Sequence, residues 1–259
     1  MNPTQNMAST QAPDALRTIT VEVFRFRPGQ DAEPVWQSYQ VPCHEEWVVL
    51  DALNYIKDHL DGSLSYRWSC HMAVCGSCGM MINDTPTLSC KAFVRDYPDH
   101  IRVAPLGNLP VIRDLVVKQD RLMNNLQAVK SWLIPREPAP VNGEYRQTPA
   151  QLAQFRHLSM CINCMLCYAA CPQVALNEGY LGPAALALAH RYNLDSRDGG
   201  TYQRMQTTAS DDGIWECTFV GECSEVCPKH VDPAGAIQQM KLASSLDWFA
   251  RRLGKGDPS

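Results

Sequence analysis

The sequence has no long hydrophobic run and no recognisable targeting segment. No stretch of about 18 apolar residues occurs in the chain, so we expect no membrane-spanning helix within it. The first 13 residues lack a basic start, an apolar core and an Arg-rich amphipathic face, which argues against a secretory signal or transit peptide. The net charge of −4 gives no reason to expect a nucleic-acid partner. With 45% hydrophobic and 19% charged residues, the expected class is a soluble globular protein.

Cysteine, in contrast, is abundant. Twelve cysteines is a high count for a chain without an export signal, and metal ligation in a reducing cytosol explains it better than disulfide bonds do. One dense run reads C-I-N-C-M-L-C-Y-A-A-C-P, and its spacing is C-x2-C-x2-C-x3-C-P. This spacing is typical of ferredoxins with two clusters, in which the fourth cysteine ligates the other cluster of the pair. The run contains Cys161, Cys164, Cys167 and Cys171.

A second run keeps this spacing but lacks one thiolate. It reads C-T-F-V-G-E-C-S-E-V-C-P, and Val220 stands where the pattern requires a cysteine. Valine has no donor atom for iron. The crossed-ligand rule therefore predicts one 4Fe–4S cluster with four cysteines and one 3Fe–4S cluster with three. The predicted ligands are Cys161, Cys164, Cys167 and Cys227 for the first cluster, and Cys171, Cys217 and Cys223 for the second.

Two other interpretations of these runs are weaker. Structural zinc usually takes two separated cysteine pairs, whereas the first run places four cysteines close together before a proline. Disulfide bonds are disfavoured because neighbours at C-x2-C spacing are poorly placed to pair with each other.

A third set of cysteines has the plant-type 2Fe–2S spacing. The loop R-W-S-C-H-M-A-V-C-G-S-C-G-M-M-I-N contains three cysteines at C-x4-C-x2-C, and a distant fourth follows. We expect Gly76 and Gly79 to adopt positive φ, which brings backbone N–H groups close to sulfur. His71 lies in the loop but is not needed as a ligand, and Cys43 belongs to no motif. The predicted ligands are Cys70, Cys75, Cys78 and Cys90.

Residue periodicity predicts a mixed first half of the chain and a helical second half. Alternating apolar residues predict strands, and apolar residues at helical spacing predict a helix that stops near Asp61. We expect strands at 19–27, 36–41, 79–83, 88–93 and 101–103, and helices at 49–60 and over most of 111–133. Later helices are expected to begin after Thr148, at Pro183 and at Pro233, the last extending to residue 246.

These elements predict an α+β chain with two domains. A segment with four prolines, residues 135–149, marks the boundary between them. The predicted division is a flexible tail at 1–17, a 2Fe–2S domain at 18–110, a connecting helix and Pro-rich linker at 111–147, and an all-α domain with two clusters at 148–259.

The three cysteine motifs together resemble the iron–sulfur subunit of quinol:fumarate reductase and of its sister, succinate dehydrogenase. The resemblance covers about residues 18 to 246, with all three sets in order. The stretch L-A-H-R-Y-N-L-D-S-R-D and the Q-Q-M-K that ends at Lys241 are closer to the fumarate reductase branch. The family implies an N-terminal β-grasp domain like plant-type ferredoxin and a C-terminal all-α domain like bacterial ferredoxin. It also implies the same 2Fe, 4Fe and 3Fe assignment.

In this family the subunit carries electrons between two partners. One partner is a flavoprotein subunit with FAD and the dicarboxylate site, and the other is a membrane anchor that holds a quinone, menaquinone or ubiquinone. The resemblance thus implies a peripheral position on the cytoplasmic side of the bacterial inner membrane. The chain itself has no G-x-G-x-x-G fingerprint and no group of residues that indicates acid–base chemistry on succinate.

The family's quinone pocket borders the 3Fe cluster. Matching residue by residue places Thr218, Phe219, Gln238 and Lys241 at that pocket, where Lys241 can hydrogen-bond or protonate a quinone oxygen. The alternative is that Gln238 and Lys241 form an ordinary solvated helix face.

Two other functions remain open at this point. The same subunit can work physiologically as part of succinate dehydrogenase, because both directions use the same clusters. A diffusible multi-cluster ferredoxin is a different class, and the two fused domains and three clusters argue against it.

Overall fold

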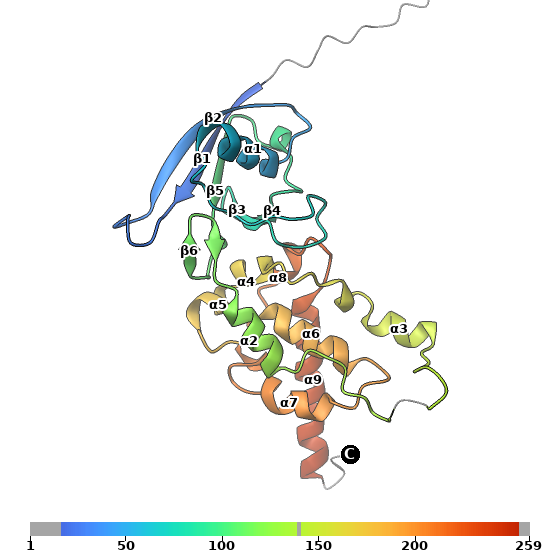
Figure 1. Cartoon of the computed structure of the whole chain (residues 1–259). Helices are drawn as coiled ribbons and strands as arrows, with labels where there is room; N and C mark the ends of the chain where they lie inside the picture. Colours follow the sequence, from blue (N-terminus) through green and yellow to red (C-terminus); the bar gives the residue numbers. More distant parts are fainter. Residues whose placement is uncertain (1–16, 139–140, 254–259) are drawn as a thin grey trace, which may run out of the picture.

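The computed structural model describes residues 17–138 and 141–253. Of the predicted tail, residues 1–16 lie outside the described residues, and Arg17 already belongs to the first strand. The chain forms a sheet-containing N-terminal part and a helical C-terminal part (Figure 1), which agrees with the predicted α+β class. None of the helices in the described ranges is long and apolar enough to cross a membrane.

The N-terminal part is built on a five-stranded sheet of order β2-β1-β5-β3-β4. Strand β1 pairs antiparallel with β2 and parallel with β5, while β3 pairs antiparallel with both β5 and β4. Alternate β1 residues such as Val21 and Val23 are buried, as the sequence pattern predicts. The strands are β1 (Arg17–Arg25), β2 (Val35–Cys43), β3 (Gly79–Ile82), β4 (Thr85–Leu88) and β5 (His100–Ala104).

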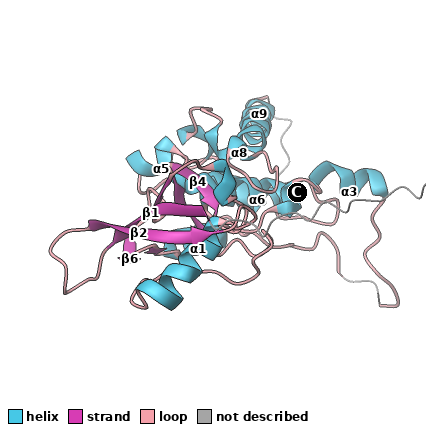
Figure 2. Ribbon diagram, turned by 90° about the horizontal axis from the view of Figure 1, so that it is seen from above, coloured by secondary structure: helices cyan, strands magenta, loops and turns pink. Residues whose placement is uncertain are grey.

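One helix covers a face of this sheet (Figure 2). Helix α1 (Val49–Tyr55) continues as a π-helical turn (Ile56–Leu60) and ends at Asp61, where the sequence predicts the stop. Its residues Leu53 and Ile56 are fully buried against Val21 and Val103 of the sheet. This core fixes the sheet from which the first cysteine loop emerges.

The predicted strand at 88–93 is wrong. Asn83 and Asp84 both have positive φ, 45° and 63°, and make the two-residue turn between β3 and β4. This tight turn places the second strand at Thr85–Leu88. The last bond of this ladder runs from the Ser89 N–H to the Cys78 carbonyl, and the Lys91 N–H then donates to the Leu88 carbonyl and closes a turn that ends the strand.

The prediction of helix over most of 111–133 is also wrong in its first half. The chain forms a two-stranded ribbon of β6 (Val111–Arg113) and β7 (Val116–Val117), and only α2 (Asp120–Ala128) is helical. The cause is Asp114, which is fully buried with φ 44°. Its carboxylate accepts hydrogen bonds from Arg25 Nε (3.1 Å) and Ser65 N (2.9 Å). These bonds hold Asp114 in a turn that a helix cannot pass through.

The helical part confirms the three predicted helix starts. Thr148 caps α3, with its Oγ1 accepting from Gln151 N at 3.2 Å, and prolines begin α6 and α9. Helix α9 extends to Arg252, beyond the predicted end at residue 246. The α-helices here are α3 (Pro149–Phe155), α4 (Leu166–Ala169), α5 (Pro172–Leu176), α6 (Pro183–Asn193), α7 (Thr201–Thr208), α8 (Glu222–Glu225) and α9 (Pro233–Arg252). Short 3₁₀ turns lie at Val94–Asp96, Leu158–Met160 and Ile214–Glu216.

The two parts share a continuous hydrophobic core. Leu88 and Cys90 from the sheet side pack in the same buried cluster as Leu166 and Tyr168 from α4. Helix α6 lies centrally in the helical part, next to α9 (Figure 1). The cysteine loops of both parts therefore meet at a fixed interface.

Candidate metal centres

The first cysteine loop surrounds its sulfur atoms with backbone N–H groups. The N–H groups of Met72, Val74 and Cys75 donate to Cys70 Sγ at 3.3–3.4 Å. These bonds, that of Met72 above all, lower the pKa of the Cys70 thiol to about 6. His71 and Ala73 adopt positive φ, 55° each, which turns the loop inward. The loop therefore stabilises thiolate, the form of cysteine that binds metal.

The other side of this loop is buried. Cys78 Sγ lies 3.3 Å from Cys90 Sγ, and Ala73 N donates to Cys90 Sγ at 3.3 Å. Burial raises the pKa of Cys90 to about 12. A buried thiolate here needs a compensating cation, which fits a site for iron.

The two loop glycines differ from each other. Gly76 has the predicted positive φ (76°), whereas Gly79 does not and is the first residue of β3. Both lie against the second cysteine run: a Cβ on Gly76 would be 2.8 Å from the Ile162 carbonyl oxygen, and one on Gly79 would be 3.1 Å from that of Cys164. The prediction of a positive φ at Gly79 is therefore wrong. The absence of a side chain at Gly79 instead permits the close approach of the Cys164 backbone. The N-terminal loop and the first helical-domain run are thus in direct contact.

Four cysteines from both dense runs surround one cavity in the helical part. Met165 and Asn163 adopt left-handed conformations, φ 64° and 54°, which turn the run around the cavity. Burial raises the pKa of the Cys164 thiol to about 11 and raises that of the Cys167 thiol well above its ordinary value. The cavity is lined by Cys161, Cys164, Cys167 and Cys227, together with apolar residues such as Leu166 and Ala187.

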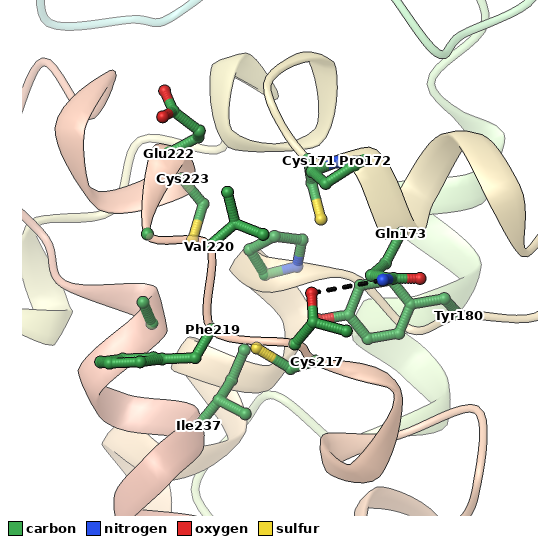
Figure 3. Close-up of a pocket in the computed structure, with 14 residues that line it drawn as sticks. Cys171, Pro172, Gln173, Tyr180, Cys217, Phe219, Val220, Glu222, Cys223 and Ile237 are labelled. Carbon is green, nitrogen blue, oxygen red and sulfur yellow. Dashed lines mark hydrogen bonds between the residues drawn. The ribbon is translucent and has the colours of Figure 1, made fainter.

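Three cysteines surround a second cavity, shown in Figure 3. Val220 lines the same cavity, next in space to the sulfur-bearing residues, and offers no donor atom there. Burial raises the pKa of Cys223 to about 12. The three cysteines are Cys171, Cys217 and Cys223, and Tyr180 and Ile237 close the apolar wall.

The three predicted donor sets all consist of cysteine thiols. Among residues 17–138 and 141–253, no three His, Cys, Asp or Glu side chains converge closely enough to hold one metal ion. Two sets of cysteines line the two cavities, and a third set lies in the N-terminal loop. Every residue of these sets offers a sulfur atom as the donor. Thiolate ligands spread around a space are what a polynuclear iron–sulfur group requires.

The four residues matched to a quinone pocket gather around Cys217. Lys241 Nζ donates to the Cys217 carbonyl oxygen at 2.7 Å, and Gln238 Nε2 lies 4.0 Å from Cys217 Sγ. Thr218 Oγ1 accepts from Gln173 Nε2 at 3.3 Å, and Phe219 is 58% exposed with φ 60°. Thr218 and Phe219 therefore line the second cavity, whereas Gln238 and Lys241 do not line it and approach Cys217 from α9, where both side chains are half-buried.

Cys43 and His71, which the sequence analysis also singled out, lie apart from the two cavities. Cys43 is buried at the end of β2, and its thiol donates to the Arg17 carbonyl oxygen at 3.4 Å. His71 Nε2 lies 2.8 Å from Asp51 Oδ1, so its ring is engaged away from sulfur.

Tyr180 lines the second cavity but was not predicted as a site residue, because nothing in its local spacing indicates that contact.

Comparisons with known proteins match two different iron–sulfur domain families to the two halves of the chain. Residues 20–124 match the model of the 2Fe-2S iron-sulfur cluster binding domain, and residues 154–228 match that of the 4Fe-4S dicluster domain. The fumarate reductase iron-sulfur subunit of Mycobacterium tuberculosis (strain CDC 1551 / Oshkosh) is 58% identical over 91% of this chain and 96% of its own length.

One relative is a succinate dehydrogenase subunit, and its identity to this chain is lower. The succinate dehydrogenase iron-sulfur subunit of Coxiella burnetii (strain RSA 493 / Nine Mile phase I) is 33% identical over 86% of this chain and 95% of its own length. A chain of the Mycobacterium smegmatis Sdh1 complex in the apo form superposes with a TM-score of 0.77 and 25% identity, covering 94% of this chain and 99% of that one. With its two matching cluster domains and these relatives, the chain belongs to the family of fumarate reductase iron–sulfur subunits, to which the succinate dehydrogenase subunits are related.

Proposed function

We propose that this chain is the electron-transfer subunit of a membrane-bound quinol:fumarate reductase. The observation that carries the proposal is the lining of the second cavity. An ordinary cubane site has four thiolates, whereas this cavity has three cysteines and Val220. Bound clusters supply stepwise one-electron transfer between a flavin and a quinone. The chain's own contribution is to hold three ligand sets in contact across its domain interface.

The proposed ligands follow the three sets of cysteines. The N–H bonds to Cys70 support a 2Fe–2S cluster in the first loop, and the lining of the two cavities supports the crossed assignment of the other seven cysteines. The proposed sets are Cys70, Cys75, Cys78 and Cys90 for 2Fe–2S, Cys161, Cys164, Cys167 and Cys227 for 4Fe–4S, and Cys171, Cys217 and Cys223 for 3Fe–4S.

The proposed domains are a β-grasp, plant-ferredoxin-like unit at 18–110 and a bacterial-ferredoxin-like unit at 148–259. The strand order of the sheet with α1 on one face supports the first, and the helices around two cysteine cavities support the second. The two family matches, residues 20–124 and 154–228, support a division into two units, although the first match extends beyond residue 110. Residues 111–147 then connect the two units.

The partners in this proposal are a flavoprotein subunit with FAD and the dicarboxylate site, and a membrane anchor with quinone. The names of the relatives support a multi-subunit enzyme of this kind. The chain then lies peripherally on the cytoplasmic side of the membrane. Fumarate reduction is the favoured physiological direction, because the fumarate reductase relative is 58% identical and the succinate dehydrogenase relative 33%.

Lys241→Leu tests the proposed quinone contact. Lys241 Nζ donates to the carbonyl oxygen of Cys217, a residue that lines the second cavity, and from this position it can donate to a quinone oxygen. A proton donor of this kind contributes about 10²–10⁴-fold to a rate, so we expect quinol-linked fumarate reduction to fall by about 10²-fold. Turnover with an artificial dye that exchanges electrons upstream should stay near the wild-type rate.

The control is Lys91→Leu, which removes an exposed lysine from the N-terminal part. Both of its activities should match the wild type. Equal losses of quinol-linked and dye-linked turnover in Lys241→Leu would assign Lys241 to structure, and unchanged quinol-linked turnover would remove it from the quinone site.

A further inference from the structure

The second half of helix α9 and its C-cap carry an exposed apolar stripe. Its four members recur at i, i+4, i+7 and i+11, and each is 58–72% exposed: Leu242, Leu246, Phe249 and Leu253. This spacing puts them on one face of the helix. The buried residues of α9, in contrast, end at Met240. The stripe therefore lies on a part of α9 that the rest of the described chain leaves uncovered.

The stripe is continuous with the proposed quinone contact. This end of α9 projects from the helical part on the side away from the sheet (Figure 1). The stripe begins at Leu242, one residue after Lys241, and extends to Leu253, which is about 17 Å at 1.5 Å per residue. Quinone is soluble in lipid and reaches its site from a bilayer. The helix that carries Lys241 thus continues as an apolar face from a site that must open toward lipid.

Aromatic and cationic side chains lie beside the stripe. The Arg252 guanidinium lies 4.4 Å from the centre of the Trp248 ring. That of Arg251 lies 4.7 Å from the ring of Tyr202 on α7. Both rings line one open groove between α7 and α9, together with Trp215. Indole and phenol rings are typical of a membrane–water interface, where arginine side chains reach from apolar surface to the headgroups.

The end of α9 is positively charged, although the whole chain has a net charge of −4. Residues 241–253 contain three cations and one carboxylate. Arg251 forms an ion pair with this carboxylate, that of Asp247, at 2.8 Å, so the excess positive charge lies on Lys241 and Arg252. A cationic helix end of this kind is complementary in charge to anionic lipid headgroups.

The composition of the stripe favours lipid over a membrane-embedded helix as its occupant. Helices that pack against each other in a membrane are rich in glycine, alanine and serine at the contact, because small residues let the backbones approach. The stripe has only leucine and phenylalanine. A helix with a large apolar face and flanking arginines and tryptophan instead lies in the plane of the interface, with its apolar face at the acyl chains.

We propose that the end of α9 binds directly to a lipid surface, with the stripe at the acyl chains and Arg252 at anionic phosphate groups. The inference rests on the proposed function, which places the chain beside a bilayer. It adds a contact between this chain and lipid to the contact with the anchor subunit. The contact holds the half of α9 that follows Lys241 against the membrane from which quinone enters.

The test is flotation of the anaerobically purified full chain with phospholipid vesicles, without the other subunits. Vesicles of phosphatidylcholine mixed equally with phosphatidylglycerol should bind the chain more tightly than vesicles of phosphatidylcholine alone. Leu246→Ser should weaken binding to the mixed vesicles about 10-fold, because a leucine side chain is then no longer buried. Arg252→Gln should weaken it about fivefold on the mixed vesicles and leave binding to phosphatidylcholine alone unchanged.

The matched control is Leu176→Ser, which removes an exposed leucine of α5, outside the stripe. Its vesicle binding should equal that of the wild type. Iron content and circular dichroism should match the wild type in both leucine variants, because both side chains are exposed. These two measurements check folding independently of lipid.

The outcomes are distinct. Equal vesicle binding by the wild type, Leu246→Ser and Arg252→Gln would overturn the inference. Absence of vesicle binding by the wild type would also overturn it, and loss of this chain from the purified complex in Leu246→Ser would then assign the stripe to the anchor protein. The proposed function has a separate readout, since it fails if the wild type shows no three-iron signal, whatever the vesicles show.

Discussion

Val220→Cys is expected to convert the three-iron cluster into a four-iron cluster. Val220 lines the cavity with Cys171, Cys217 and Cys223, at the position where the ferredoxin spacing requires a ligand. A thiolate there completes the set of donors for a cubane. The oxidised form should then lose its paramagnetic signal, and iron should rise from about nine to about ten per chain. The added thiolate charge should also lower the potential of the cluster, because it disfavours the reduced form.

The matched control for this variant is Val220→Ala. It also alters an exposed side chain (57% for valine) at the same backbone position, but it adds no donor atom. Val220→Ala should keep the oxidised signal and the wild-type iron content. An unchanged three-iron signal in Val220→Cys would mean that residue 220 does not face the missing corner, and the explanation of the three-iron cluster would be wrong.

Asp198→Ala is expected to destabilise the helical domain severely. Asp198 Oδ1 and Oδ2 accept from Arg204 Nη1 (2.7 Å) and Nη2 (2.8 Å), and both side chains are fully buried. The Asp198 carboxylate also accepts from Ile134 N (2.9 Å), which ties the connecting segment to the helices. Removing one partner of a buried pair leaves an unpaired charge and costs about 3–5 kcal/mol, so the unfolding midpoint should fall by about 6–20 °C.

The control for this variant is Asp247→Ala. It removes the exposed i,i+4 pair with Arg251 (2.8 Å), which is worth about 0.3–0.5 kcal/mol, so its midpoint should fall by at most about 2 °C. A comparably small fall in Asp198→Ala would contradict a structural role for the buried pair. Thermal unfolding followed anaerobically by circular dichroism measures both variants.

The same ion pair predicts a direction for acid stability. Burial acts to raise the pKa of Asp198, but the hydrogen bonds from Arg204 and from two backbone N–H groups prevail and lower it below the ordinary value. A carboxyl whose pKa is lower in the folded state contributes stability above its unfolded pKa and loses it as the pH falls through the folded value. Midpoints measured between pH 7 and pH 3 should therefore fall for the wild type more steeply than for Asp198→Ala. Parallel pH profiles would contradict this contribution.

The cysteine sets were predictable because ligand spacing is a local property of the chain. Cys161, Cys164 and Cys167 lie within one turn-rich run, and this alone places them around one cavity. The contribution of Cys227 required the crossed-ligand rule, since it comes from a run far along the sequence. Which irons these sets hold stays a prediction.

Other features could not be predicted, because they depend on contacts between residues that are far apart in the sequence. Asp114 ended the predicted helix because Arg25 and Ser65, distant in sequence, hold its carboxylate. Gly79 was expected to adopt positive φ, yet it does not, and its missing side chain instead permits the contact with the Cys164 backbone in the other domain. The hydrogen bonds that Arg121 of α2 donates to backbone carbonyls within residues 174–180 are of the same kind, because α2 reads as an ordinary amphipathic helix.

Electron paramagnetic resonance of the anaerobically purified protein, with iron analysis, tests the central claim of three clusters most directly. Oxidised 3Fe–4S is paramagnetic, whereas oxidised 2Fe–2S and ordinary 4Fe–4S are silent. We predict a signal in the oxidised protein, new signals on stepwise reduction, and about nine irons per chain. No signal in the oxidised protein together with about ten irons per chain would contradict the claim, because a ligand other than residue 220 would then complete the cluster at Cys171, Cys217 and Cys223.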